Sequence, residues 1–295
     1  MNKIKKIFFL SLLFFSLTFS DEIIDNFFIQ VKKLKESAKN FRIETIESKI
    51  SGEIKFSEQS YTLAKILFQK NLPQNLKIDG YMRCKFSPES DKLELDYLYI
   101  YLNSDIDSWI ISQVKNDIQI IIPSLGVIIK DKKENLKNFE KSQDTNSQKN
   151  FLPVNFLDLL LTNLIENEDT IKSKIEFKEE RKRDNLKTFV YDMQIPEGVV
   201  NLEILDNFYT LRRIEIINNK EKTNIIIDYP APEKEIKIYS YLPNSIELKI
   251  EKDKNIVNFC LSDIKYNKLF SENDFKIKEM SVLEMISLFF LKAIK

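Results

Sequence analysis

Apolar and polar side chains alternate over most of the chain between Phe41 and Lys265, and this period of two constrains the fold more than any other feature. The clearest run is residues 93–102, where leucines and tyrosines occupy the odd positions and Leu98, Ile100 and Leu102 the even ones. Because successive side chains of a strand point to opposite faces, the pattern predicts β-strands. Short polar breaks rich in Pro, Asn, Ser and Asp separate the runs, so we expect neighbouring strands to be antiparallel.

This pattern predicts strands along most of the chain, at residues 41–56, 61–68, 78–86, 93–102, 109–114, 118–122, 173–177, 188–193, 199–204, 210–217, 222–228, 235–239, 245–251 and 255–265. Helical spacing of apolar residues predicts three helices instead, at residues 23–34, 153–164 and 280–294. The helix at 153–164 is apolar nearly all round.

Several of the expected strands are apolar on both faces, so both sides of the sheet must be covered or enclosed. We therefore expect a mainly β protein with a few helices (α+β), in the form of an incomplete, strongly curved antiparallel β-barrel with helices covering its concave face. A sandwich and a closed barrel are the alternatives. No internal repeat or boundary is evident. The expectation is a single domain over residues 21–295, with a polar mobile loop at 130–150 and an extra helix at 280–294.

The first twenty residues have the form of a signal peptide. Three lysines precede an apolar stretch from Ile7 to Phe19, and Thr18 and Ser20 place small residues before a cleavage point at Asp21. An uncleaved inner-membrane anchor is the alternative reading. Both interpretations place the rest of the protein outside the cytoplasm, in the periplasm.

Composition excludes several classes of chemistry. The chain has 45 basic and 45 acidic residues, which argues against a nucleic-acid surface. It has no histidine, which removes the commonest general base and the commonest metal ligand. Two cysteines cannot build a Cys-rich zinc site, and four isolated glycines leave no phosphate-binding loop. We expect no catalytic residues, no metal, no cofactor and no nucleic-acid partner.

The two cysteines, Cys84 and Cys260, both lie in strand-like segments. In an oxidising compartment they could pair, but nothing in the sequence shows that they are close. Two unpaired thiols buried as small apolar residues is the reading we favour.

Three stretches of the chain carry a resemblance to a known family. The first is a signal peptide and an amphipathic helix, followed by Asn40-Phe41-Arg42-Ile43-Glu44 and Ser51-Gly52-Glu53-Ile54. The second is the segment at 111–123, with a polar turn at Asn116-Asp117, an apolar strand and Pro123. The third runs from Leu242-Pro243-Asn244 through residues 261–268 to the acidic and Phe-containing segment at 271–277. Together they resemble the periplasmic outer-membrane lipoprotein-carrier (lipoprotein-sorting, LolA-like) family, from which the chain departs in its Asn-Asp turn and in the isoleucines that follow it.

The resemblance implies a half-open β-barrel that holds the acyl chains of a lipoprotein, with helices as a lid. It implies a non-enzymatic carrier that takes lipidated proteins or lipid as cargo, exchanges them with inner- and outer-membrane transfer machinery, touches membranes transiently and works as a monomer. Shielding acyl chains from water is worth about 0.8 kcal/mol per buried CH₂, so such transport needs no covalent chemistry.

The residues expected to line the lipid cavity share aromatic or β-branched side chains on neighbouring strands: Tyr97, Tyr99, Tyr101, Trp109, Ile111, Ile120 and Ile122. The residues expected to act as lid or membrane contacts lie on the three helices: Phe27, Phe28, Leu157, Leu160, Met285 and Phe289. For each of these positions, ordinary packing in the core is the alternative role.

Two other functions compete with lipid transport. An envelope protein–protein interaction or assembly module would use the same fold with a filled interior and an exposed apolar patch. A hydrolase would need paired carboxylates, for which Asp263, Glu272 and Asp274 are the candidates.

Overall fold

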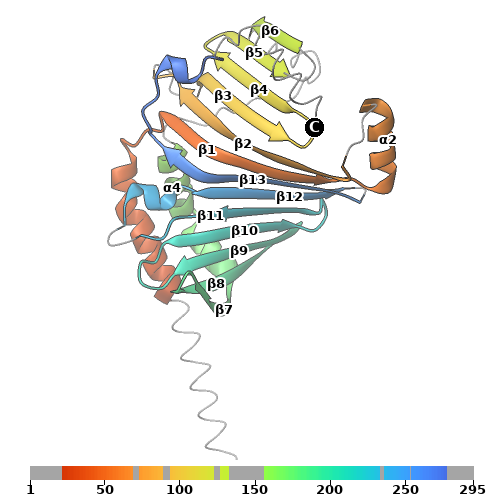
Figure 1. The fold of residues 1–295 in the computed structure, drawn as a ribbon. Helices are drawn as coiled ribbons and strands as arrows, with labels where there is room; N and C mark the ends of the chain where they lie inside the picture. Colours follow the sequence, from red (N-terminus) through yellow and green to blue (C-terminus); the bar gives the residue numbers. More distant parts are fainter. Residues whose placement is uncertain are drawn as a thin grey trace, which may run out of the picture. The chain divides into compact units, whose positions relative to one another are not determined.

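The computed structural model describes residues 22–68, 73–88, 94–122, 127–132, 156–232, 236–252 and 254–277. The expected signal peptide, most of the polar loop at 130–150 and the helix at 280–294 lie outside these residues. The described part is mainly β: thirteen antiparallel strands and four α-helices (Figure 1).

The helices are an amino-terminal one at residues 22–38, α2 (Glu58–Phe68), α4 (Phe156–Glu166) and α5 (Glu168–Lys174). Two short 3-10 helices are η2 (Ile238–Tyr241) and η3 (Glu272–Asp274). The strands are β1 (Thr45–Lys55), β2 (Asn75–Phe86), β3 (Leu95–Ser104), β4 (Ser108–Val114), β5 (Asp117–Ile122), β6 (Val127–Lys132), β7 (Ile175–Arg183), β8 (Leu186–Ile195), β9 (Gly198–Leu205), β10 (Leu211–Asn218), β11 (Thr223–Asp228), β12 (Ser245–Lys252) and β13 (Asn255–Tyr266).

The strand order is β6-β5-β4-β3-β2-β1-β13-β12-β11-β10-β9-β8-β7, with β6 and β7 at its two ends. The sheet is thus open, neither closed nor strongly curled, and the expected strongly curved, incomplete barrel is not observed. Both end strands carry charges, at Lys130-Asp131-Lys132 in β6 and along most of β7, and charged side chains oppose further pairing of an edge strand. The chain divides into two compact units.

The first unit contains residues 1–41 and 155–250. Its strands β8 to β12 form consecutive antiparallel pairs, and their register sorts side chains by polarity. One face, the apolar face, carries aromatic and aliphatic side chains: Phe189, Tyr191, Met193, Ile195, Val200, Leu202, Ile204, Ile214, Ile216, Ile225, Ile227, Ile246, Leu248 and Ile250.

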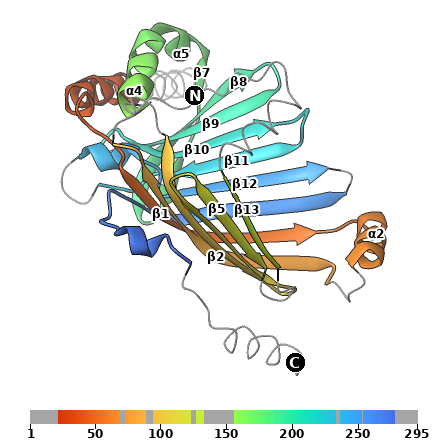
Figure 2. The ribbon, with the colours of Figure 1, turned by 90° about the horizontal axis from the view of Figure 1, so that it is seen from above.

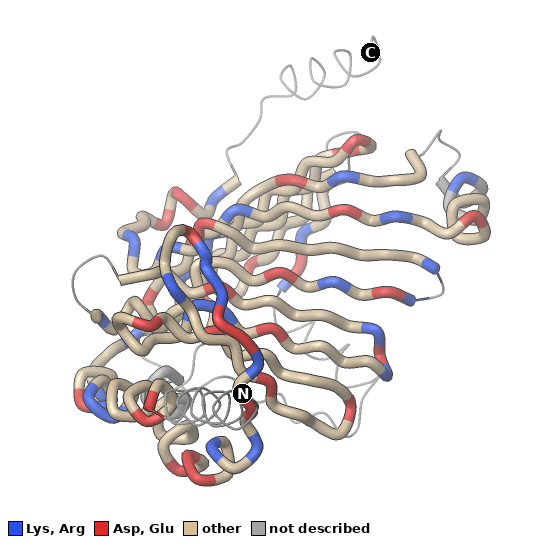
Figure 3. The backbone as a smooth tube through the Cα atoms, turned by 90° about the horizontal axis from the view of Figure 1, so that it is seen from below, with Lys and Arg blue, Asp and Glu red and all other residues tan. Residues whose placement is uncertain are grey.

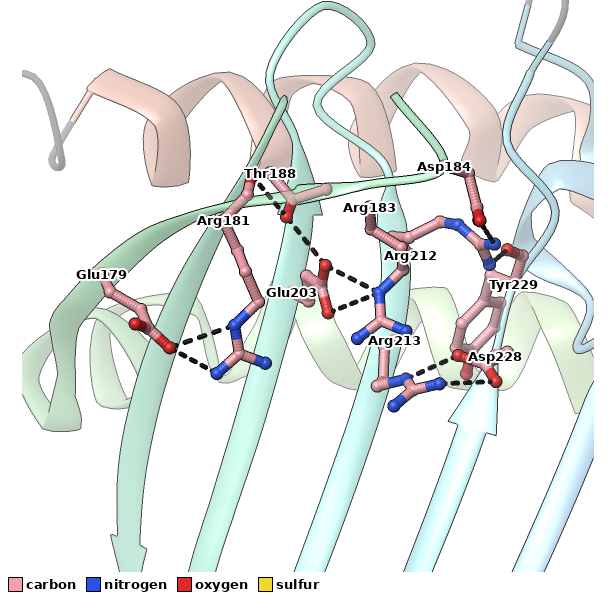
Figure 4. A network of polar contacts seen from close by, with 10 residues as sticks. All are labelled: Glu179, Arg181, Arg183, Asp184, Thr188, Glu203, Arg212, Arg213, Asp228 and Tyr229. Carbon is pink, nitrogen blue, oxygen red and sulfur yellow. Dashed lines mark hydrogen bonds and ion pairs between the residues drawn. The ribbon is translucent and has the colours of Figure 1, made fainter. Parts of the chain in front are cut away.

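The opposite face of these strands, the network face, carries ion pairs and hydrogen bonds (Figure 4). Arg183 Nε donates to both carboxylate oxygens of Glu203, at 3.0 and 3.1 Å, and Thr188 Oγ1 donates to Glu203 Oε1 at 2.7 Å. Arg213 forms a bidentate pair with Asp228, at 2.7 and 3.0 Å. Because these side chains come from β7 to β11, the contacts tie successive strands together in one register.

Helices cover part of the apolar face. The amino-terminal helix buries Ile23, Phe27, Val31 and most of its other apolar residues, as its 3.6-residue spacing predicts, whereas Ile29 is 46% exposed. Figure 4 views the sheet from the network face and shows helices behind the strands, on the side of the apolar face. The sheet of this unit therefore has the polar network on one side and the helices on the other.

The second unit contains residues 42–154 and 251–295. Its register also sorts side chains. One face, the aliphatic face, carries Ile46, Ile50, Ile54, Leu76, Ile78, Met82, Cys84, Leu98, Ile100, Leu102, Trp109, Ile111, Ile118, Ile120, Ile122, Val257, Phe259 and Leu261. The opposite one, the tyrosine face, carries Tyr81, Tyr97, Tyr99 and Tyr101 among charged residues.

Three sequence expectations about elements were wrong. Residues 61–68 were expected as a strand but belong to helix α2, because Ser57 accepts a hydrogen bond from Ser60 N through its side chain and begins a helix there. Residues 235–239 were expected as a strand, but the described part of this segment leads into the 3-10 helix η2. Residues 173–177 were expected as a strand, but residues 173 and 174 belong to helix α5, and β7 begins at Ile175.

Neither cysteine forms a disulfide, as expected from the favoured reading. Cys84 pairs with Ile46 on the aliphatic face, whereas Cys260 pairs with Ser51 on the opposite face. Burial of Cys84 raises the pKa of its thiol to about 12, so this group is an inert part of the core.

Replacing Glu203 with Ala should destabilise the first unit by about 3–5 kcal/mol, because Glu203 is 3% exposed and its removal leaves Arg183 without its carboxylate. The matched control is Glu179→Ala, which removes an exposed carboxylate that pairs with Arg181 on the same sheet and should cost less than about 1 kcal/mol. Urea denaturation of both variants measures the difference. Equal losses would contradict a structural role for the network.

Replacing Gly80 with Ala should destabilise the second unit by about 1–3 kcal/mol, because a Cβ there would lie 1.9 Å from the carbonyl oxygen of Tyr101. Gly52→Ala is the control, since a Cβ at Gly52 would lie 3.1 Å from its nearest neighbour, the carbonyl oxygen of Asn258, which would need to move only slightly. Thermal unfolding should rank the variants in that order, and the reverse order would show that the sheet relaxes more easily at Gly80.

Candidate functional site: an apolar face covered at one end

The apolar face of the first unit is the candidate site because the described part of its interior has almost no hydrogen-bonding side chains. Between strands β8 and β12 its only polar atom is the hydroxyl of Tyr191, which is 1% exposed beside Phe177. Polar side chains occur at the rim, with Lys187 at one end and Asn218 opposite Thr223 at the other. A surface of this kind has nothing to offer a polar ligand and favours one made of hydrocarbon.

Burial changes along the length of this face. At the end near the helices, Phe189, Tyr191 and Ile204 are all 2% exposed or less. Farther along the same strands, Met193, Val200 and Ile216 are only half-buried. The face is thus closed at the helix end and less buried at the end where the β8–β9 and β10–β11 turns lie, and the described helices of this unit stand at one end of these strands (Figure 2).

Ion pairs hold the amino-terminal helix to α5 at the closed end. Lys172 Nζ lies 2.6 Å from Asp25 Oδ1 and 2.8 Å from Glu168 Oε1, and Lys32 Nζ lies 2.6 Å from Glu168 Oε2. Lys172 also lies 5.4 Å from the ring centroid of Phe28. Burial raises the pKa of Glu168, but hydrogen bonds from Lys172 and Lys32 outweigh it, and the pKa is lower than usual. The hydrogen bonds that Lys172 donates to Asp25 and Glu168 raise the pKa of Lys172.

Acid should weaken the attachment of the amino-terminal helix. Because the folded-state pKa of Glu168 is lowered, its pairs stabilise the fold above the ordinary carboxyl pKa, about 4.3, and this contribution is lost as the pH falls through the lowered value. Urea midpoints measured from pH 7 down to pH ~3 should therefore fall less steeply for Glu168→Gln than for the unmodified protein. Glu166→Gln, an exposed neighbour on α4, should keep the original pH dependence. An unchanged slope in Glu168→Gln would disprove the role of these pairs.

The seven expected cavity residues lie in the second unit, but the structure does not bring them to one surface. Trp109, Ile111, Ile120 and Ile122 lie on the aliphatic face, where Ile111 is paired with Ile120. Tyr97, Tyr99 and Tyr101 point to the opposite face, where Tyr101 pairs with Tyr81 on β2. The alternation within β3 was predicted correctly. The error was to count the three tyrosines as cavity lining together with the four residues of the aliphatic face.

The tyrosine face is a packed surface in its own right. Tyr97 is 5% exposed, its ring lies 5.4 Å from that of Phe275, and its hydroxyl donates to Glu272 Oε1 at 2.6 Å. That hydrogen bond raises the pKa of Tyr97 to about 12. Tyr81 and Tyr99 stack with centroids 5.7 Å apart. These contacts account for Tyr97 as a core residue.

The expected lid residues are only partly described. Phe27 and Phe28 are 4% and 1% exposed and contact each other edge to face. They lie on the inner side of the amino-terminal helix, away from solvent. Leu157 and Leu160 lie on α4, but their side chains are outside the described part. Met285 and Phe289 lie outside the described residues altogether.

The three carboxylates considered for hydrolysis are held by separate partners. Asp263 Oδ2 lies 2.5 Å from Lys49 Nζ, Glu272 accepts from Tyr97, and Asp274 accepts from both the backbone and the hydroxyl of Ser271. Each partner lowers the pKa of its carboxyl group. The arrangement gives none of them a raised pKa suited to a general acid.

Within the described residues, no three or more Cys, Asp or Glu side chains lie together in a way that suits a metal ion. In that same part of the chain, every helix is too short or too polar to cross a membrane. Basic and acidic residues are interspersed along the strands (Figure 3).

The sequence reasoning missed the apolar face of the first unit. A signal for it was present, since residues 213–216 and 245–250 alternate between polar residues and isoleucine or leucine, and residues 225–227 are three consecutive isoleucines. We gave weight to aromatic residues, whereas the face consists largely of isoleucine, leucine and valine.

Comparisons with known proteins assign neither a family nor a function to the chain. No protein-family model matches the chain, and no curated protein matches it. Among solved structures the chain is similar to one described as an outer membrane lipoprotein-sorting protein domain from Vibrio parahaemolyticus, with a TM-score of 0.31 and 10% identity. The match covers 84% of this chain and 95% of that chain. The resemblance is distant, so the function proposed below rests on the geometry of the apolar face.

Proposed function

We propose that the protein is a non-enzymatic periplasmic carrier that binds the acyl chains of a lipidated protein, or of free lipid, on the apolar face of its first unit. The observation that carries the proposal is a sheet face made largely of Ile, Leu and Val side chains, whose one interior hydroxyl, that of Tyr191, is buried. The described helices of the unit cover one end of this face. The expected signal peptide supports the periplasmic location in this proposal.

The chemistry of this face favours lipid over protein as its occupant. Protein–protein interfaces are only about 56–65% apolar and carry about one hydrogen bond per 100–200 Å². The interior of the apolar face provides isoleucines such as Ile214, Ile216 and Ile225 in place of such donors and acceptors. An acyl chain needs none, and each CH₂ that it buries contributes about 0.8 kcal/mol.

The network on the reverse side of the strands explains how the face can stay partly uncovered. The bidentate Arg213–Asp228 pair and the Arg183–Glu203 pair hold β7 to β11 in register without help from the apolar side. An exposed apolar sheet face would otherwise tend to collapse or associate. The carrier thus keeps a preformed surface for cargo.

A charge on the apolar face should abolish binding of acyl ligands. Ile216 and Ile217 are neighbours on β10 and both are half-buried, but Ile216 lies on the apolar face and Ile217 on the network face. Ile216→Asp should weaken binding of a fluorescent acyl probe at least tenfold, since covering even two fewer CH₂ groups costs about 1.6 kcal/mol. Ile217→Asp should change it less than twofold.

Circular dichroism on both variants controls for folding, because each introduces the same charge at an equivalent depth. Mass spectrometry of lipid extracted from the purified protein provides a second measurement, with co-purified lipid expected. Equal affinity of the two variants for the probe would rule out the apolar face as the binding surface.

A second candidate function is docking of an envelope protein on the aliphatic face of the second unit. Trp109 is 48% exposed there and Phe259 36%, and interface centres are enriched in such aromatic residues. Trp109→Ser should then reduce capture of a protein partner in crosslinking and leave binding of the acyl probe unchanged.

A further inference from the structure

The open end of the apolar face leads to a hollow at two adjacent turns. Residues 194–199 of the β8–β9 turn line it together with Asn219 and Lys220 of the β10–β11 turn, and its volume is about 730 Å³. Ile195 belongs both to this hollow and to the row Phe189, Tyr191, Met193, Ile195 along the apolar face. The hydrocarbon surface and the hollow are therefore continuous.

The polar groups of the hollow carry no net charge. Glu197 Oε1 lies 3.4 Å from Lys220 Nζ, and Glu197 Oε2 accepts from Asn218 Nδ2 at 3.2 Å. The side chains of Lys220 and Glu197 are 74% and 48% exposed, so the pair is open to solvent. Gln194 and Asn219 add amide groups, each of which provides donors and an acceptor. An uncharged ligand with hydroxyl or ester oxygens fits this set better than an ion does.

The distance along the strands suits an acyl chain. Ile195 and Phe189 are six positions apart on β8, which is about 20 Å at the usual rise of a strand. One leaflet of a bilayer has a hydrocarbon depth of about 15 Å, half of about 30 Å. A chain that spans one leaflet would therefore extend from the hollow over about three quarters of the distance to Phe189.

We propose that this hollow binds the polar headgroup of the acylated ligand, that the acyl chain runs from it toward the helices, and that the preferred headgroup is of the uncharged acylglycerol class. This inference rests on the proposed function, since it assigns the orientation and headgroup of the ligand on the same apolar face. Anionic headgroups are disfavoured because Glu197 already neutralises Lys220 and would repel them.

The test compares a monoacylglycerol with a fatty acid of the same chain length, both below their micelle concentrations and at a pH that ionises the carboxyl group. The unmodified protein should bind the monoacylglycerol at least fivefold more tightly. Glu197→Gln leaves Lys220 without its counter-charge, so the fatty acid should gain affinity until the two ligands agree within about twofold. Binding of the monoacylglycerol should stay within twofold of its original value.

Glu221→Gln is the matched control, because it makes the same change of charge on the β10–β11 turn at an exposed position outside the hollow. It should preserve the original preference, which excludes a general effect of net charge. Equal binding of the two ligands by the unmodified protein, or equal effects of the two variants, would overturn the headgroup site.

The outcomes separate this inference from the function on which it rests. Acyl binding that depends on Ile216 but ignores the headgroup and Glu197 would remove the headgroup site and leave the carrier. An absence of binding by either ligand to the unmodified protein would remove both.

Discussion

The antiparallel register is the constraint on which the rest of this structure depends. Side chains alternate with a period of two, so a slip of one position between β10 and β11 would move Ile214 and Ile216 to the polar side and bring Glu215 among isoleucines. The ion pairs of the network face oppose such a slip, because Arg213 reaches Asp228 in one register only. The same interactions that fix the strands therefore define the face to which a hydrophobic ligand would bind.

Much of the fold could be predicted from the sequence, and the reasons for the misses are physical. Alternation located most strands and the hairpin of β4 and β5, and helical spacing located the amino-terminal helix and α4. Helix α2 was missed because its start depends on one serine at residue 57 and not on periodicity. The strong curvature expected of the sheet was also wrong, because curvature depends on how neighbouring strands twist and bend together, and no local pattern reports this.

The candidate site was harder to predict than the fold. Alternation shows which residues share a face of one strand, but not which faces of successive strands coincide. The seven residues first chosen as cavity lining were divided between two faces for this reason, with Tyr99 on one and Ile111 on the other. The sequence also does not report how deeply each apolar residue is buried. Phe189 and Ile216 are both apolar strand residues, but only Phe189 lies at the closed end of the apolar face.

The pairing of β1 with β13 has a consequence for how the second unit is made. Ile50 lies opposite Leu261, so β1, which is synthesised early, cannot pair with β13 until nearly the whole chain has been synthesised. Such a large sequence separation slows folding, because the chain loses the conformational entropy of a long loop before the contacts between the two strands stabilise it. Under the proposed export, this delay is useful: a polypeptide whose ends must meet stays extended enough to thread through a translocation channel, and it completes its sheet only on the far side.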